Sequence, residues 1–494
     1  MPIVQLLGCL LTATAVALSI ANAHAAPGDL DNAGFGSGTG KVIAAIGSNN
    51  DLVSAVALQP DGKIVVAGSC LNGGNNDFCL ARFLPGGALD TSFNATGKVV
   101  TAIGPGNDLA SALVLQPDGK IVVAGYCSNG SNNDFCLARY LASGALDTSF
   151  NTTGVVITAL GPSNDLALAM ALQPDGKIIT AGFCFDASTR YSCFARYLAN
   201  GALDTSFNGT GTVTSAIGSS ASLALQPDGK IVAAGPCFNG VNNDFCLARY
   251  LANGALDNSF NTTGVVITPV GSSDDNASAV ALQPDGKIVV AGSCSNGVNS
   301  HFCVARYLVN GALDTSFNTS GTAITAIGPG NDVASALALQ HDGKILVSGT
   351  CSNGGNNDFC LTRYLANGTL DASFNATGKV ITDITSSPDN GTALALQPDG
   401  KIVIAGYCFG GSNYDFCLAR YQGGPIEARN CSMDIDGDNQ MIATTDGLIA
   451  TRVMLGIVGN AALSGITFAP HATRTTWPLI RDYLVTQCGM SIIP

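Results

Sequence analysis

The chain repeats one unit seven times. The motif Leu-Gln-Pro-Asp-Gly-Lys, or a close variant, begins at Leu58, Leu115, Leu172, Leu225, Leu282, Leu339 and Leu396. Successive motifs are 57 residues apart, except for one step of 53 residues between the third and the fourth. A period of this length is typical of solenoids, propellers or arrays and argues against independent domains.

Each unit contains four short segments with strand character. In the second unit these lie near 111–115, 120–125, 135–141 and 155–159, and Gly-, Pro-, Asn- and Asp-rich turns separate them. Apolar or alternating runs bounded by turn residues predict strands, and no segment of the repeat has a helical apolar period. Seven units of four strands predict an all-β fold, a seven-bladed β-propeller.

The two ends of the repeat region are complementary. The last unit stops after its third strand, near Tyr421, and residues 28–47 match the final part of a unit, as at 87–104. We expect this N-terminal segment to supply the missing fourth strand and close the ring, which leaves no open sheet edge. An open stack, the alternative, would not need the half-unit. The predicted propeller covers 26–425, and a helical module follows over 426–494.

The repeats resemble the bacterial delta-60 repeat family. The resemblance rests on LQPDGKIVVAG, an Asp-Phe-x-Leu-Ala-Arg-Tyr strand and G-x-L-D-x-S-F, and it covers about residues 28–421. It implies a propeller fold. The family is defined by its repeat, so the resemblance implies no particular activity.

The N-terminus predicts export. Residues 1–25 are apolar and end in Ala23-His24-Ala25, with Ala21-Asn22-Ala23 as the alternative cleavage site. They contain no Lys or Arg, and an N-terminal membrane anchor is the alternative reading. No later segment is long and apolar enough to span a bilayer. We expect a signal peptide and a protein that is secreted, periplasmic or at the cell surface.

Sixteen of the seventeen cysteines lie beyond the predicted signal peptide, which contains Cys9. An even number in an exported chain predicts disulfides. In each unit we expect one cysteine to end the second strand and the other to begin the third, so that the two face each other across a hairpin. A zinc site would need four ligands, and a redox pair would favour Cys-x-x-Cys. The expected pairs are Cys70/Cys79, Cys127/Cys136, Cys184/Cys193, Cys237/Cys246, Cys294/Cys303, Cys351/Cys360, Cys408/Cys417 and Cys431/Cys488.

An arginine and an aspartate recur in the units, and we expect them to form one internal ion pair or turn bond per blade. The arginines are Arg82, Arg139, Arg196, Arg249, Arg306, Arg363 and Arg420, and the aspartates are Asp90, Asp147, Asp204, Asp257 and Asp314. Phe93 and its counterparts are expected to pack between blades.

One face of the propeller is the expected ligand face. The second-to-third and fourth-to-first connections emerge there, and they are rich in Asn and Asp, including Asn50-Asp51 and Asn107-Asp108. The predicted contact residues are Asp77, Asp134, Asp244, Asp358 and Asp415. They could bind cations, sugars or a basic partner, or they could simply build tight loops. Exposed aromatic residues are few, chiefly Phe185, Phe238 and Tyr414.

Three departures from the repeat lie on this face. The third unit has FDASTRYS at 185–192 in place of the Asn/Gly loop, the link before Leu225 is shorter, and His301 replaces a loop Asp. Sequence drift explains them as well as function does. No nucleophile elbow, HExxH, phosphate loop or nucleotide fingerprint occurs, so the motifs do not indicate catalysis.

The C-terminal segment predicts a calcium loop. The oxygen ligands of DIDGDNQMIATTD would be Asp434, Asp436, Asp438, Gln440 and Asp446, and the loop resembles those of dockerin and EF-hand modules. It departs from them because Asp446 lies one residue late and no second loop follows. A metal-free turn before a helix is the alternative. Helices are expected near 447–456 and 476–487.

Charge and motifs together set the expected function. A net charge of -13 without basic runs argues against nucleic acid and anionic membranes as partners. We expect a monomeric, non-catalytic binding scaffold that contacts a protein or glycan at the cell surface. The alternatives are an extracellular hydrolase or lyase acting on polysaccharide, and a passive envelope structural protein.

Overall fold

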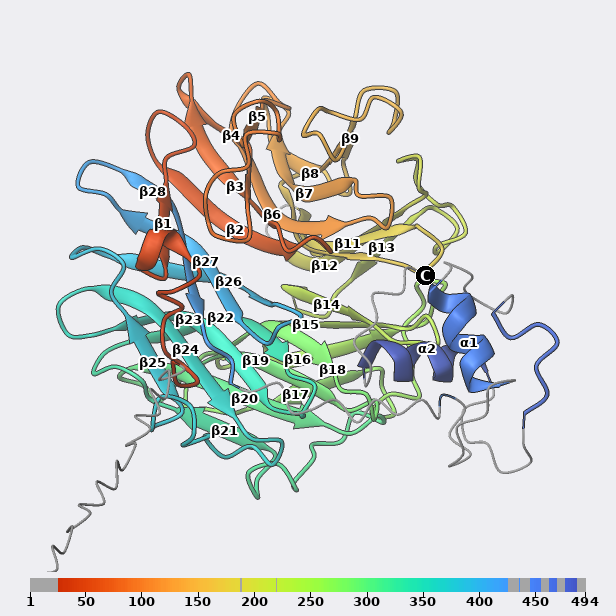
Figure 1. The fold of residues 1–494 in the computed structure, drawn as a ribbon. Coiled ribbons are helices and arrows are strands. Elements are labelled where there is room, and N and C mark those ends of the chain that lie inside the picture. Colours follow the sequence, from red (N-terminus) through yellow and green to blue (C-terminus); the bar gives the residue numbers. More distant parts are fainter. Residues whose placement is uncertain are drawn as a thin grey trace, which may run out of the picture.

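The seven repeats fold into seven four-stranded antiparallel sheets arranged as blades around a central axis (Figure 1). The computed structural model describes residues 25–186, 189–218, 220–424, 435, 445–454, 462–468 and 476–486. The predicted seven-bladed β-propeller is confirmed. The predicted signal peptide lies almost wholly outside the described residues.

The strands follow the repeat. The first, innermost strands are β2 (Asp51–Leu58), β6 (Asp108–Leu115), β10 (Asp165–Leu172), β14 (Ser222–Leu225), β18 (Asp275–Leu282), β22 (Asp332–Leu339) and β26 (Asp389–Leu396). The second strands are β3 (Ile64–Asn72), β7 (Ile121–Ser128), β11 (Ile178–Asp186), β15 (Ile231–Phe238), β19 (Ile288–Ser295), β23 (Ile345–Ser352) and β27 (Ile402–Phe409).

The third strands are β4 (Asn75–Phe83), β8 (Asn133–Tyr140), β12 (Thr189–Tyr197), β16 (Asn243–Tyr250), β20 (Ser300–Tyr307), β24 (Asn357–Tyr364) and β28 (Tyr414–Tyr421). The fourth, outermost strands are β5 (Lys98–Thr101), β9 (Val155–Thr158), β13 (Thr212–Ser215), β17 (Val265–Thr268), β21 (Thr322–Thr325), β25 (Lys379–Thr382) and β1 (Lys41–Ala44). A short 3-10 helix, η1 (Gly36–Gly38), precedes β1.

The N-terminal segment closes the ring, as predicted. Strand β1 pairs antiparallel with β28, with Lys41 opposite Ala419, and Figure 1 shows this red strand beside the blue end of the propeller. Asp31 of the same segment forms an ion pair with Arg420, in which Asp31 Oδ2 lies 2.8 Å from Arg420 Nη2. The seventh blade is therefore built from both ends of the repeat region.

The hydrophobic core is divided among the junctions between blades. Each of seven buried clusters combines the second to fourth strands of one blade with strands of the next, as where Phe78 and Leu80 meet Ile121 and Tyr140. The Tyr140 hydroxyl also donates to Thr101 Oγ1 of the preceding blade at 2.9 Å. Each blade thus gains its apolar burial from its neighbours, which is why an isolated unit would lack a core.

In six blades, a glycine in the second strand allows the first strand to approach closely. The first strands of these six blades carry a bulge, which in β6 lies between Ala110 and Ala112, next to Gly125 of β7. A Cβ at Gly125 would lie 2.0 Å from the Leu109 carbonyl oxygen. The recurrent Ala-Gly of the repeat is therefore a packing requirement.

Two helices follow the propeller in the chain, α1 (Asp446–Met454) and α2 (Trp477–Thr486). Ile449 and Val453 of α1 belong to the same buried cluster as Ile480 and Leu484 of α2. Both predicted helices are present. Among the described residues, no helix is long and apolar enough to cross a membrane.

Candidate functional site: the loop face and the junction of blades three and four

The repeated arginine is structural, as predicted. Arg82 Nε lies 2.8 Å from Asp90 Oδ2, and both side chains are buried. Nη1 of Arg82 donates to the Ala142 carbonyl of the next blade at 2.6 Å, and its guanidinium stacks 4.6 Å above Phe93. Burial opposes ionisation of Asp90, but hydrogen bonds from Ser92 and the charge of Arg82 lower the pKa of Asp90.

The same ion pair recurs in every blade. The seven pairs are Arg82–Asp90, Arg139–Asp147, Arg196–Asp204, Arg249–Asp257, Arg306–Asp314, Arg363–Asp371 and Arg420–Asp31. Each pair lies within one blade, and Nη1 of each arginine donates to a carbonyl of the next blade, so no charge of this set is free for a ligand.

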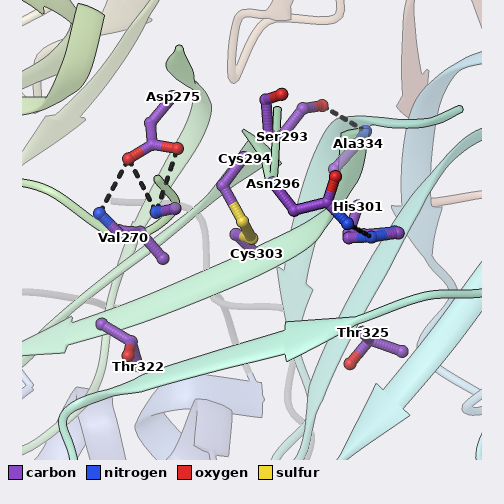
Figure 2. The surroundings of a disulfide bond; sticks show 12 residues. Val270, Asp275, Ser293, Cys294, Asn296, His301, Cys303, Thr322, Thr325 and Ala334 are labelled. Atoms are coloured by element: carbon purple, nitrogen blue, oxygen red, sulfur yellow. Dashed lines mark hydrogen bonds between the residues drawn. A yellow bond between two sulfur atoms is a disulfide. The ribbon is translucent and has the colours of Figure 1, made fainter. Parts of the chain in front are cut away.

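Seven of the eight predicted disulfides are present, with Cα atoms 5.4–5.9 Å apart. They are Cys70–Cys79, Cys127–Cys136, Cys184–Cys193, Cys237–Cys246, Cys294–Cys303, Cys351–Cys360 and Cys408–Cys417. Figure 2 shows Cys294–Cys303 in the fifth blade. Cys431 and Cys488 lie outside the described residues, so the eighth pair stays a prediction.

The position of the second cysteine in each pair was predicted wrongly. It does not begin the third strand directly across from its partner, but lies inside that strand, buried and opposite the glycine of the second strand. In the first blade, for example, Cys79 lies opposite Gly68, whereas Cys70 lies opposite Asp77. The cysteines placed in this way are Cys79, Cys136, Cys193, Cys246, Cys303, Cys360 and Cys417.

The length of the hairpin explains this difference. The ladder between β3 and β4 continues past Cys70 as far as Asn72 opposite Asn75, so the third strand begins earlier than expected. Cys70 and Gly68 point to the same side of β3, because side chains alternate along a strand. The disulfide therefore runs diagonally across the hairpin, over a glycine that has no side chain to obstruct it.

The predicted ligand-face aspartates lie at the base of the loops. Asp77, Asp134, Asp244 and Asp358 are buried, and Asp415 is partly buried. Asn72 Nδ2 donates to Asp77 Oδ2 at 2.8 Å, whereas Asp77 Oδ1 has no hydrogen-bond partner in the described part of the chain. Direct contact with a large ligand would require the overlying loop to move.

A second ring of carboxylates faces the first. Asp108 was expected in a loop, but it begins β6, is fully buried and accepts hydrogen bonds from Ile103 N (2.7 Å) and Gly104 N (2.9 Å). Burial is the main cause that raises the pKa of Asp108, and the carboxylate of Asp77 in the preceding blade raises it further.

Carboxylates therefore meet in pairs between adjacent blades. In each pair the charge of the loop carboxylate raises the pKa of the strand carboxylate: Asp77 with Asp108, Asp134 with Asp165, Asp244 with Asp275, and Asp415 with Asp51. At the junction of blades five and six, His301 Nδ1 lies 3.8 Å from Asp332 Oδ2 instead. This pairing was not predicted from the sequence, although most partners are separated by the same 31 residues.

The junction of blades three and four has lost both members of the pair. Tyr191 lies opposite Cys184, the place that Asp77 takes opposite Cys70. The first strand of blade four is shortened to β14, and the buried hydroxyls of Ser192 and Ser220 hydrogen-bond there. The shorter link and the altered loop noted in the sequence thus meet at one junction.

Two cavities are lined in part by the altered loop of blade three, and the larger of them opens at this junction. The larger, of about 420 Å³, is lined by residues including Arg190, Gly218, Phe238 and Asn243. Its Phe238 side chain is 67 % exposed, which is unusual for a phenylalanine.

The smaller cavity, of about 200 Å³, is lined by residues including Phe185 and Tyr191. The Arg190 guanidinium lies 4.1 Å above the ring of Phe183, and this ring contacts Phe185 edge-on at 5.6 Å. Two of the three aromatic residues expected on the loop face therefore line these two cavities, and the third, Tyr414, packs against Tyr407 in blade seven.

Comparison with protein families supports the repeat. The family described as "Domain of unknown function (DUF5122) beta-propeller" matches residues 59–93, 116–150, 173–207, 226–260, 283–317, 340–374 and 397–423. The chain carries seven DUF5122 β-propeller repeats. The first six matched segments run from the first turn of the blade to the phenylalanine that packs beside the repeated arginine. The delta-60 name and the dockerin resemblance stay predictions.

Comparison with curated proteins gave no match. Among solved structures, an ulvan lyase of a polysaccharide lyase family has 12% identity and a TM-score of 0.45, over 78% of this chain and 96% of that chain. A catalytically inactive virginiamycin B lyase from Staphylococcus aureus has 11% identity and a TM-score of 0.43, over 77% and 98%.

Drosophila Semaphorin 1b, extracellular domains 1–2, has 9% identity and a TM-score of 0.39, over 77% of this chain and 86% of that chain. Two of these three structures are lyases and the third is a semaphorin. Likeness at this level carries no argument about function.

Proposed function

We propose that this DUF5122 propeller is an exported, non-catalytic binding scaffold that holds a glycan at the loop face, at the junction of blades three and four. The observation that supports this is the convergence of two departures from the repeat, beside an exposed phenylalanine, at one junction. The altered loop, the shortened link and the exposed Phe238 all border the same cavity. Drift would be expected to scatter such changes over the seven blades.

The chemistry of the junction suits a sugar. Exposed aromatic rings stack on the C–H faces of sugar rings, and Phe238 and Phe185 lie at the two cavities. Arg190 and Asn243 supply hydrogen-bond donors beside Phe238. The loss of the local carboxylate pair removes two negative charges from a chain of net charge -13, which lowers the local repulsion of a uronic acid.

The test uses the full chain on a panel of immobilised neutral and uronic-acid polysaccharides. We expect Phe238→Ala and Arg190→Ala each to weaken binding at least tenfold. Phe409→Ala is the matched control, because Phe409 lies at the corresponding position of blade seven. Retained binding in both junction variants, or equal loss in the control, would refute the site. Turnover of a polysaccharide would favour the hydrolase or lyase alternative.

The calcium loop of the C-terminal module remains a separate proposal. Asp446 begins α1, and the other four proposed ligands lie outside the described residues. Calcium would be held by carboxylate oxygens in front of the helix. Equilibrium dialysis with calcium, carried out on the full chain and on its Asp434→Asn/Asp436→Asn variant, tests this proposal. The variant should bind fewer calcium ions per chain, and an equal number would contradict the proposal.

A further inference from the structure

The junction of blades six and seven contains a third carboxylate. Asp383 follows β25 at a position where five other blades have alanine: Ala45, Ala102, Ala159, Ala216 and Ala326. One oxygen from each of Asp358, Asp383 and Asp389 lies within 4.8 Å of the other two. Among the residues that the structure describes, this is the one group of three such side chains.

The two inner carboxylates are fixed, and one of them is incompletely satisfied. Asp358 is 1% exposed, and its Oδ2 accepts a 2.5 Å hydrogen bond from Asn353 Nδ2. Its Oδ1 has no hydrogen-bond partner among the described residues. A buried carboxylate oxygen without a partner is costly, so an unfilled contact at this position needs an explanation.

Asp389 is held by its own turn. Its Oδ2 accepts hydrogen bonds from Ile384 N (2.6 Å) and Thr385 N (3.0 Å), and Thr385 Oγ1 donates to Oδ1 at 2.8 Å. Asp383 is exposed, so the cluster has one side open to solvent. The arrangement is two oriented carboxylates and an accessible third.

The local charge is consistent with a divalent cation. Three ionised carboxylates carry three negative charges, and the cation that acts on Asp358 is Lys41, whose Nζ donates to the Asp383 carbonyl at 2.5 Å. Two negative charges remain uncompensated. Burial raises the pKa of Asp358 and of Asp389, which is the cost that a bound cation would offset.

We propose that Asp358, Asp383 and Asp389 bind calcium and that the ion links blade six to blade seven. Calcium–oxygen distances of about 2.3–2.6 Å allow oxygens about 5 Å apart on opposite sides of one ion. Magnesium, at about 2.0–2.1 Å, requires a tighter and more regular set. Water would complete the coordination on the open side. The proposal does not depend on the glycan site.

The test uses the full chain with Asp436→Asn and Asp438→Asn, so that the predicted C-terminal loop cannot contribute. Calorimetric titration should give one calcium site with a dissociation constant of about 10⁻⁴–10⁻³ M, as is usual for extracellular modules. Asp383→Ala in this background should weaken binding at least tenfold. The substitution introduces the residue of the other blades, so the fold should be kept.

The control is Asp399→Asn, which changes an exposed turn aspartate that pairs with Lys401 in blade seven. It should leave calcium binding unchanged. Calcium should raise the thermal unfolding temperature of the background protein and of the control, but not that of Asp383→Ala. No calcium binding in the background, or equal binding after Asp383→Ala, would overturn the proposal.

Discussion

The ion pair between Asp31 and Arg420 predicts how strongly the ring is closed. Both side chains are buried, and the two residues are 389 positions apart in sequence. Asp31→Asn keeps the shape of the side chain and removes its charge, which leaves the Arg420 guanidinium buried without its carboxylate. Removal of one partner of a buried pair typically costs about 3–5 kcal/mol.

The lower end of this range applies here. Nη1 and Nη2 of Arg420 keep their hydrogen bonds to the Pro85 and Gly34 carbonyls, at 2.5 and 2.6 Å. We therefore expect Asp31→Asn to reduce the free energy of unfolding by about 3 kcal/mol. Urea unfolding followed by far-UV circular dichroism measures this loss. Tryptophan fluorescence is unsuitable, because the single tryptophan, Trp477, lies in α2 and would report on the C-terminal module.

The matched control is Asp147→Asn in blade two. Asp147 accepts the same contact from Arg139 at 2.8 Å, but these residues are only eight positions apart. Both variants should lose similar stability. Only Asp31→Asn should also release the segment that carries β1, so trypsin should cleave at Lys41 faster in this variant. A cost below about 1 kcal/mol for Asp31→Asn, with about 3 kcal/mol for Asp147→Asn, would refute the latch.

Three further predictions concern the repeated blade. The double substitution Cys127→Ser/Cys136→Ser removes a disulfide between residues nine apart, and the chain-entropy model predicts a loss of about 2.6 kcal/mol in the free energy of unfolding. An unchanged urea midpoint would contradict this prediction. Gly125→Ala places a Cβ 2.0 Å from a carbonyl oxygen and should lower the thermal unfolding temperature sharply, and a neutral effect would exclude the tight approach. Asp204, with a pKa lowered to about 2, stabilises the fold above its ordinary pKa of 3.8, and this contribution is lost as the pH falls through about 2. Asp108 has a raised pKa, so its contribution to stability is fully present below pH 3.8. This contribution is lost as the pH rises through the pKa of Asp108 in the folded state. Stability should therefore be greatest in weak acid, and a urea midpoint that is highest at neutral pH would refute this balance.

The sequence was sufficient for the features that depend on one blade. Turn residues and apolar runs marked the strands, the half-unit at 28–47 predicted closure, and the spacing of nine predicted seven disulfides. The repeated arginine and aspartate were correctly paired, because they lie eight residues apart on adjacent segments. Seven copies of each pattern made these local features easy to separate from drift.

The features that depend on contacts between blades were not predicted. Asp77 and Asp108 belong to different sheets, so their proximity follows from how two blades pack. The burial of Asp108 was missed for the same reason, since Asn-Asp in a Gly-rich stretch resembles an exposed turn. Phe185 and Phe238 were noted separately, and only the fold shows that each lines a cavity together with residues of the altered loop.

The division of each carboxylate pair between two blades affects how such a protein can evolve. Duplication of a 57-residue unit copies one half of two different pairs, and each new neighbour supplies the other half. A ring can therefore gain a blade without new substitutions at the contacts between blades. A change of use at one junction requires alterations in two units, as the junction of blades three and four shows with Tyr191 and the shortened β14. Duplication therefore copies whole repeats, whereas a new binding site at a junction depends on changes in the two repeats that meet there.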